Sequence, residues 1–364
     1  MALDGYVRVA KHAALNEPAA LLEALAALDG PPAAVADRLR RHHLIRLVQA
    51  TVSDDALRAR LPRALVEAIA SRRRVGRVPI ETQLAVFDGV HRALAAAGVP
   101  VLLLKGVWFA ERLYGGLHRR PQHDVDLLVR PKDFRRAGRC LRALGFARKG
   151  RDLHARSVVR DGVTVDLHRH LRWAPAYALD EAAMWDAAQD VRVGGVAMRT
   201  LSDEYSLVML TTASFEDLGQ GACRLKPLLD LYLLLRRLDP TTDWEAFLAR
   251  RERENLLAVT VNVLALVTAL FTADAELPRL AAALARRRHL CVLAGREAVL
   301  ALVAAPRKHD PNLIWFGRVY PGSMAHYLAW FWYAGFPANA GRFLPALRSG
   351  LRLAGARRTA RAGP

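Results

Sequence analysis

The segment that most constrains the fold is residues 101–129, VLLLKGVWFAERLYGGLHRRPQHDVDLLV, because it ends in a short apolar strand that carries two aspartates. Its first four residues form an unbroken apolar run, which is typical of a strand covered on both faces. Gly106 ends this run at a place where the backbone can approach a ligand closely. In HDVDLLV the side chains alternate between the two faces of the strand, so Asp124 and Asp126 point the same way.

This pair of aspartates predicts a metal site. Two carboxylates so close together repel each other and raise each other's pKa unless a cation lies between them. Hard divalent cations such as Mg²⁺ take oxygen ligands and are usually held by one or two carboxylates together with substrate phosphates. A D-x-D strand after a glycine turn and basic residues therefore favours metal-assisted phosphoryl chemistry. The alternative is a chance match in which one aspartate faces solvent at the strand end.

A third carboxylate lies on a later strand. VTVDLH at 163–168 alternates after a turn at Asp161–Gly162, with Thr164, Asp166 and His168 on one face. If this strand lies beside 125–129, Asp166 completes a three-carboxylate cluster that can hold two metal ions. His168 is then expected to contact the substrate or to support the metal ligands, and a surface or hydrogen-bonded histidine is the alternative.

The strand before this turn is rich in positive charge. It carries His154, Arg156 and Arg160, which we expect beside the site, where they would meet an anionic substrate. The alternative is an exposed basic strand at the edge of the sheet.

These segments resemble an uncharacterised branch of the nucleotidyltransferase superfamily that includes DNA polymerase beta. The resemblance rests on LLLKG, a following tyrosine, RPQHDVDLLV, a helix ending in LGF, and VDLH, and it is firmest between residues 84 and 170 within a wider span of 40–290. RLKPLLDLYLLL at 224–235 is similar to a further helix of that branch. The positions that match the pattern are Lys105, Gly106, Tyr114, Arg120, Asp124, Asp126, Asp166 and His168.

The resemblance implies an enzyme that transfers a nucleoside monophosphate from an NTP to an acceptor and releases pyrophosphate. Asp124 and Asp126 would hold Mg²⁺ or Mn²⁺, and Asp166 would hold the metal on the nucleophile side. The groups expected at the triphosphate are Lys105, the Gly106 backbone, Arg120 and Lys226, while Tyr114 and His168 would contact the substrate or support the ligands. The wider superfamily ends its first strand in Gly-Ser where this chain has Lys105–Gly106.

The sequence leaves the acceptor open. A small molecule, a peptide, or a hydroxyl or phosphate on another protein fits the reaction equally. Two other functions remain as alternatives: an inactive nucleotidyltransferase-fold protein that binds a nucleotide or a partner, and a basic nucleic-acid binder. The intact set of aspartates argues against the first, and the absence of an RNA- or DNA-binding signature means that nucleic acid is not expected as a specific partner.

Composition supports a largely helical protein around one small sheet. The chain has 364 residues, of which 52% are hydrophobic, and it is rich in alanine and leucine, which favour helices. We expect an α/β (α+β) fold, with a small mixed-sheet nucleotidyltransferase core and large helical additions at both ends. The predicted parts are a helical region at 1–78, the core at 79–200, a helical domain at 201–300 and an aromatic, arginine-rich extension at 301–364.

The formal net charge of +19 favours polyanionic partners, although an arginine-rich composition alone would give the same charge. The last segment gathers tryptophans at 315–332 before an arginine tail, which indicates either peripheral contact with an anionic membrane or a helix buried on the core. No apolar signal core or run of 18 uncharged apolar residues is seen, so we expect a cytoplasmic protein.

Overall fold

The computed structural model describes residues 2–71, 78–120, 122, 124–151, 155–171, 177–219, 221, 224–304, 315, 318 and 319. The chain divides into two compact units. The first contains Met1–Leu171 and Met184–Ser202, and the second contains Arg172–Ala183 and Asp203–Pro364. Each unit is described by itself.

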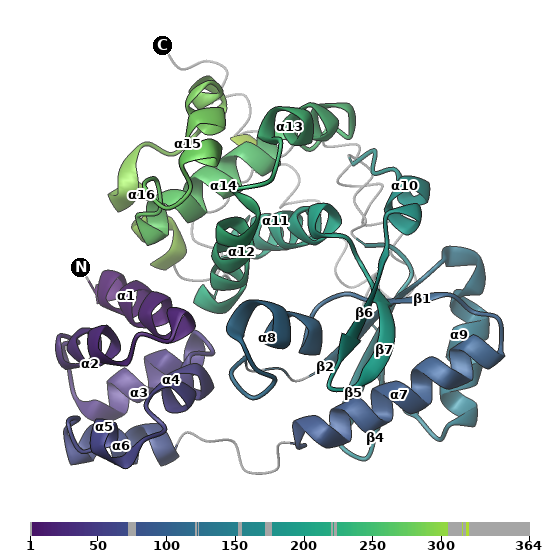
Figure 1. Ribbon diagram of the computed structural model, residues 1–364, viewed down its shortest axis with the longest axis horizontal. Coiled ribbons are helices and arrows are strands. Elements are labelled where there is room, and N and C mark those ends of the chain that lie inside the picture. Colours follow the sequence, from purple (N-terminus) through teal and green to yellow (C-terminus); the bar gives the residue numbers. More distant parts are fainter. Residues whose placement is uncertain are drawn as a thin grey trace, which may run out of the picture. The chain divides into compact units, whose positions relative to one another are not determined.

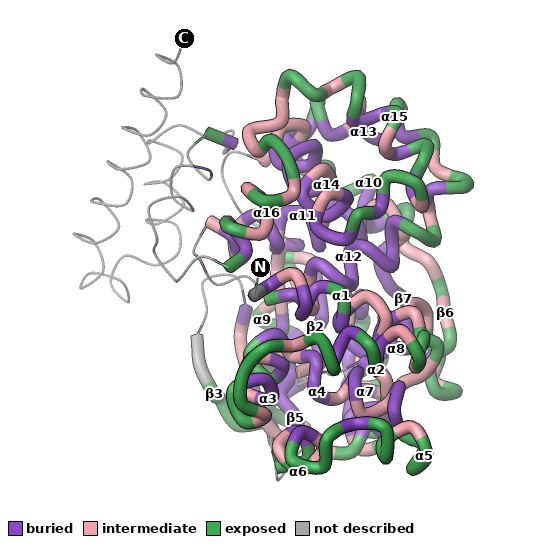
Figure 2. The backbone as a smooth tube through the Cα atoms, turned by 90° about the vertical axis from the view of Figure 1, so that its left-hand side faces the viewer, coloured by how far each residue is buried: buried purple, intermediate pink, exposed green. Residues whose placement is uncertain are grey.

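The first unit begins with short helices: α1 (Ala2–Leu15), α2 (Pro18–Ala26), α3 (Pro32–Arg41), α4 (Ile45–Thr51), α5 (Asp55–Arg58) and α6 (Arg63–Ser71). Proline occupies the first turn of α2 and α3, where its missing N–H costs no hydrogen bond. Figure 2 shows α5 as exposed, and none of its residues is buried. Arg119, from the loop before the aspartate strand, donates to Asn16 Oδ1 at 2.7 Å and to the Ala13 carbonyl at 3.1 Å, and so ties these helices to the core.

The centre of the first unit is a seven-stranded mixed sheet in the order β3-β4-β5-β2-β1-β7-β6 (Figure 1). Its central strand β2 pairs antiparallel with β1 and parallel with β5, while β7 pairs parallel with β1. The remaining neighbours pair antiparallel. The strands are β1 (Val101–Leu103), β2 (Asp124–Val129), β3 (Ala147–Arg151), β4 (Ala155–Arg160), β5 (Val163–His168), β6 (Gln189–Val193) and β7 (Val196–Thr200).

Two helices cover one face of this sheet. α7 (Ile80–Ala96) packs on β1, β5 and β7, and α9 (Phe134–Ala143) packs on α7 and β5. The β5 side chains on this face, Val163, Val165 and Leu167, are each at most 2% exposed. Alternation along β5 therefore places Asp166 and His168 on the opposite face.

The shorter elements are α8 (Val107–Tyr114), the 3₁₀ turn at Pro131–Asp133 and α10 (Glu181–Asp186).

A hairpin around Gly194–Gly195, made of β6 and β7, adds two strands to the sheet. Both turn glycines have positive φ, 53° and 83°, as a tight two-residue hairpin turn requires. β7 then extends the sheet beyond β1, where Thr200 Oγ1 donates to the Leu103 carbonyl at 2.6 Å. The first core strand is consequently an inner strand.

The second unit is helical, with α11 (Asp203–Gly219), α12 (Leu225–Leu238), α13 (Trp244–Arg253), α14 (Leu257–Phe271), α15 (Pro278–Ala285), a 3₁₀ turn (Arg288–Leu290) and α16 (Gly295–Ala304). α14 contacts α11, α12, α13, α15 and α16 and is apolar nearly all round, as expected for a helix inside a bundle. Figure 2 shows α12 and α14 mostly as buried. Tyr232 stacks on Phe271 with a centroid distance of 4.7 Å.

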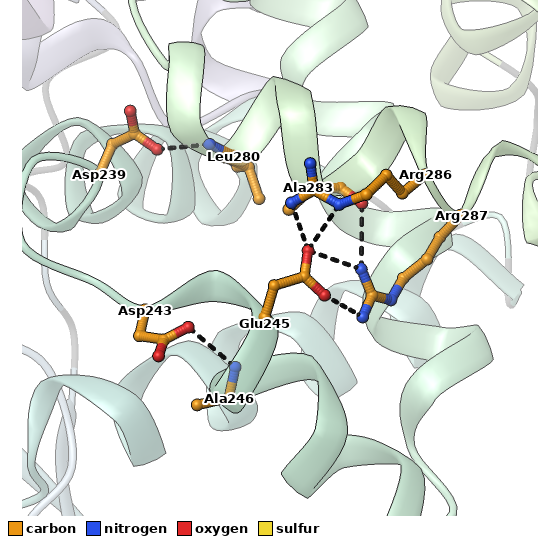
Figure 3. Close-up of polar contacts among 8 residues, drawn as sticks. All are labelled: Asp239, Asp243, Glu245, Ala246, Leu280, Ala283, Arg286 and Arg287. Atoms are coloured by element: carbon orange, nitrogen blue, oxygen red, sulfur yellow. Dashed lines mark hydrogen bonds and ion pairs between the residues drawn. The ribbon is translucent and has the colours of Figure 1, made fainter.

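Carboxylates organise the connections in this bundle (Figure 3). Asp239 is 2% exposed and accepts hydrogen bonds from Trp244 Nε1 at 2.8 Å and from the Leu280 amide at 2.7 Å. Asp243 caps α13 through the Ala246 amide at 3.0 Å. Glu245 is half-exposed and pairs with both Arg286 and Arg287, which links α13 to the end of α15.

The predicted fold class is confirmed: a mixed α/β protein with one sheet and helical regions before and after it. The four-part division at 78, 200 and 300 stays a prediction. Most of the extension at 301–364, including the aromatic segment and the arginine tail, lies outside the described residues. Within the described part of the chain, no helix combines the length and apolarity needed to cross a membrane.

Candidate active site

The parallel pairing of β2 with β5 brings the three aspartates together. Asp126 lies opposite Asp166 in the register, and Asp124 lies opposite Thr164. Each aspartate offers a carboxylate oxygen, and these oxygens all lie within 4.8 Å of one another. The cluster predicted from the sequence is therefore present, although its members come from strands separated by a helix and a hairpin.

Asp126 is the buried member of the cluster, at 4% exposure. Its Oδ2 lies 3.3 Å from Lys105 Nζ, and its Oδ1 lies 3.2 Å from His168 Nε2. Burial by itself would raise the pKa of this carboxyl, but the charge of Lys105 and the hydrogen bond and charge of His168 outweigh burial and lower the pKa below its usual value. Asp126 is thus held as a carboxylate at neutral pH, which is the form that binds a cation.

Asp166 is positioned by a residue that the sequence reasoning missed. Ser157 Oγ on β4 donates a hydrogen bond to Asp166 Oδ1 at 2.5 Å. The signal was present in the sequence, because the two-residue turn at Asp161–Gly162 fixes the hairpin register and places Ser157 opposite Asp166. Such a hydrogen bond holds the rotamer of a ligand without occupying both of its oxygens.

A second missed residue is Lys149. Arg148 pairs with Val158, whose side chain is on the α9 face, so alternation places the next residue, Lys149, on the carboxylate face. Lys149 Nζ donates to Thr164 Oγ1 at 2.9 Å, on the face of β5 that also carries Asp166. A positive charge from the edge strand therefore reaches the carboxylate face, and this placement depends on how β3 pairs with β4.

The Lys-Gly turn lies at the end of β1, next to the aspartates. The Leu104 amide donates to the Asp126 carbonyl at 3.1 Å, which extends the β1–β2 ladder up to the turn. Gly106 then adopts φ 74° and ψ −118°, a conformation that side chains disfavour, and α8 begins directly after it. A Cβ at Gly106 would lie 3.2 Å from Gln122 Oε1, so the turn is also closely packed.

The other predicted site residues occupy different surroundings. Arg120 is 2% exposed, donates to the Gly106 carbonyl at 3.4 Å and lies over the Phe109 ring, so it braces the turn from within the fold. Tyr114 is buried at the end of α8. Lys226 belongs to the second unit, where its Nζ lies 3.7 Å from Asp230 Oδ2. The roles proposed for these residues at a nucleotide stay predictions.

The expectation that the basic side chains of β4 lie beside the aspartates was wrong. Because Ser157 faces Asp166, its neighbour Arg156 must point to the other face of the sheet, toward α9. Arg160 also points that way and donates to the Leu144 carbonyl at 2.7 Å. Nor is β4 the edge strand, since β3 lies outside it. His154 lies outside the described residues.

The donor set fits a hard divalent cation. All ligand groups in the cluster are carboxylates, which suit Mg²⁺ and Mn²⁺ and lack the nitrogen and sulfur donors that zinc sites favour. Lys105 brings a positive charge to Asp126 Oδ2, and His168 Nε2 hydrogen-bonds to Asp126 Oδ1.

Fold and site together define a mixed α/β protein with a carboxylate cluster on central strands beside a tight Lys-Gly turn. The chain belongs to a family described as uncharacterised nucleotidyltransferase, whose model matches residues 31–272. It is similar to the solution structure of the antibiotic-resistance factor ANT(2'')-Ia, at 15% identity over 58% of this chain and 100% of that one, with a TM-score of 0.36. No curated protein matches the chain.

Proposed function

We propose that this protein is an active, metal-dependent nucleotidyltransferase that transfers a nucleoside monophosphate from an NTP to an acceptor. The observation that carries the proposal is the convergence of Asp124, Asp126 and Asp166 within 4.8 Å, on the strands next to the Lys-Gly turn. Family membership implies a nucleotide substrate. The acceptor is a hydroxyl or phosphate of a small molecule, a peptide or another protein.

In the proposed reaction an acceptor oxygen attacks the α-phosphorus of the NTP, the bond from that phosphorus to the β-phosphate oxygen breaks, and pyrophosphate leaves. Asp124 and Asp126 would hold Mg²⁺ or Mn²⁺, and Asp166 would hold a second ion. These ions would supply charge neutralisation for the triphosphate and for the acceptor oxygen. Asp166 would also accept the acceptor proton, and the hydrogen bond from Ser157 Oγ supports this role by holding its carboxylate.

The remaining groups would bind and orient the triphosphate. Lys105 and the N–H at the start of α8 supply positive charge and a donor where β1 ends. Arg120 keeps the turn in shape through its hydrogen bond to the Gly106 carbonyl. His168 holds Asp126 in its ligand orientation. Catalysis by such a site consists mainly of positioning and charge stabilisation.

The test uses the full chain with Mn²⁺ or Mg²⁺, each α-labelled NTP and clarified lysate as a source of acceptors. Label transfer and released pyrophosphate are measured together. Asp124→Ala with Asp126→Ala should abolish both. Asp190→Ala, which removes an exposed carboxylate on β6, is the matched control and should change neither.

Two results would count against the proposal. Undiminished transfer by the double variant would show that the aspartates are not the reaction centre. Metal-dependent binding of NTP without transfer or pyrophosphate release would instead assign the chain to the inactive, nucleotide-binding alternative.

A further inference from the structure

A cavity of about 280 Å³ lies between α9 and the β3–β4 hairpin, within the first unit. It is lined by three arginines and three smaller or apolar residues: Gly138, Arg142, Phe146, Arg148, Arg156 and Val158. This lining includes no acidic side chain. A concentration of guanidinium groups without carboxylates favours an anionic occupant, because like charges this close otherwise repel one another.

The cavity is separate from the aspartate cluster. On β4, Ser157 faces Asp166, whereas the adjacent residues Arg156 and Val158 face α9. The sheet itself therefore lies between the cavity and the three carboxylates. An anion in the cavity cannot be the triphosphate that the metal site would hold.

The helix is shaped to accommodate one of these arginines. Gly138 occupies the interior of α9, where glycine costs about 1 kcal/mol relative to alanine. A Cβ at this position would overlap Arg156 Nη1, so the guanidinium can keep this position only beside a glycine. Arg156 also lies over the Phe134 ring, with its Cζ 5.0 Å from the centroid, and this contact fixes the guanidinium plane.

The other two arginines complete a site of suitable size and charge. Arg142 and Arg148 are exposed, so their guanidinium groups are free to close on an incoming anion. Three guanidinium groups suit a phosphate, because each can donate two parallel hydrogen bonds to its oxygens. The volume lies just below the roughly 300 Å³ at which pockets for whole small molecules begin. It therefore matches a phosphate or diphosphate group better than a complete nucleotide.

We propose that this arginine cavity is a second anion-binding site, which takes a small ligand through its phosphate or diphosphate group. The site does not depend on the proposed transferase reaction, since it requires neither the aspartates nor a metal ion.

The test measures binding of pyrophosphate to the full chain by calorimetry, in chelator and at about 0.15 M salt, where weak surface charge is screened. The altered protein carries Arg142→Gln and Arg148→Gln. The matched control carries Arg135→Gln and Arg139→Gln, which remove the same charge from exposed positions outside the lining. A 5′-phosphorylated oligonucleotide, titrated in parallel, tests nucleic acid as the source of the phosphate.

We expect saturable pyrophosphate binding that weakens about tenfold or more in the lining variant and less than about twofold in the control. Gly138→Ala should weaken it similarly while the protein stays folded by circular dichroism, because the new methyl group displaces Arg156. Equal weakening in both double variants, or no saturable binding of pyrophosphate, would overturn the proposal. Tight binding of the oligonucleotide alone would do the same, and would point to a surface for nucleic acid instead.

Discussion

Replacing Asp166 with asparagine should stabilise the metal-free protein while removing its response to metal. Asparagine keeps the shape of the side chain and an oxygen that accepts from Ser157. It removes one of three negative charges that lie within 4.8 Å. Two unit charges at this distance repel by about 3.5 kcal/mol at an effective dielectric constant of 20, and by about 0.9 kcal/mol in water.

The net stabilisation by Asp166→Asn should be smaller than the repulsion of about 3.5 kcal/mol. Lys105 offsets part of the charge of Asp126, and the side chains of Asp124 and Asp166 are only half-buried, so that solvent screens their repulsion. We therefore expect a stabilisation of about 1 kcal/mol, which raises the melting temperature of a unit of this size by roughly 2–4 °C.

The assay is thermal unfolding with and without Mn²⁺. Metal at about 100 times its Kd should stabilise the natural protein by about 2.7 kcal/mol, and this increase should disappear in Asp166→Asn. Asp161→Asn serves as the control, because it removes an exposed carboxylate from the turn of the same hairpin. A lower melting temperature for metal-free Asp166→Asn, or an undiminished response to Mn²⁺, would refute the reasoning.

Further predictions concern groups that act through hydrogen bonds. Ser157→Ala should weaken Mn²⁺ binding by about 10–100-fold, measured by metal titration, with Ser157→Thr restoring it. Asp239→Ala should lower the free energy of unfolding in urea by about 3 kcal/mol, because it leaves buried donors on α13 and α15 without their acceptor. Hydrogen bonds from Arg287 and Arg286 lower the pKa of Glu245 from 4.5 to about 2, so its contribution is complete above pH 4.5 and is lost as the pH falls toward 2. The pair is half-exposed, so the stability difference between the natural protein and Glu245→Gln should be only about 0.5–1 kcal/mol at pH 6 and should shrink by pH 3.

The aspartate cluster was predictable because local rules determine its parts. Alternation along β2 and β5 placed each carboxylate, and the Asp161–Gly162 turn identified the hairpin. The same alternation should have assigned Arg156 to the face opposite Asp166, since the turn determines which β4 residue lies across from that aspartate. The error came from treating every charged residue on β4 as a neighbour of the site.

Other features had no local signal. β7 joins β1 across about a hundred residues, and its attachment rests on contacts such as the hydrogen bond from Thr200 to the Leu103 carbonyl. Lys149 lies on the carboxylate face because β3 pairs with β4 in the register Arg148↔Val158, and no motif in the sequence marks that pairing. In the sequence, Gly138 is simply a glycine inside a helix, and its role is seen only once the structure places Arg156 against it.

The parallel β2–β5 pair also limits which changes of chain length this protein can tolerate during evolution. Deleting or inserting one residue between the Asp161–Gly162 turn and Asp166 would rotate that carboxylate into the layer beneath α7 and α9, and would bring Leu167 or Val165 up among the metal ligands. Homologues should therefore keep this spacing constant while varying freely in length elsewhere, for example between the N-terminal helices. A homologue that shortens it by one residue will have lost the cluster, whatever its overall sequence identity.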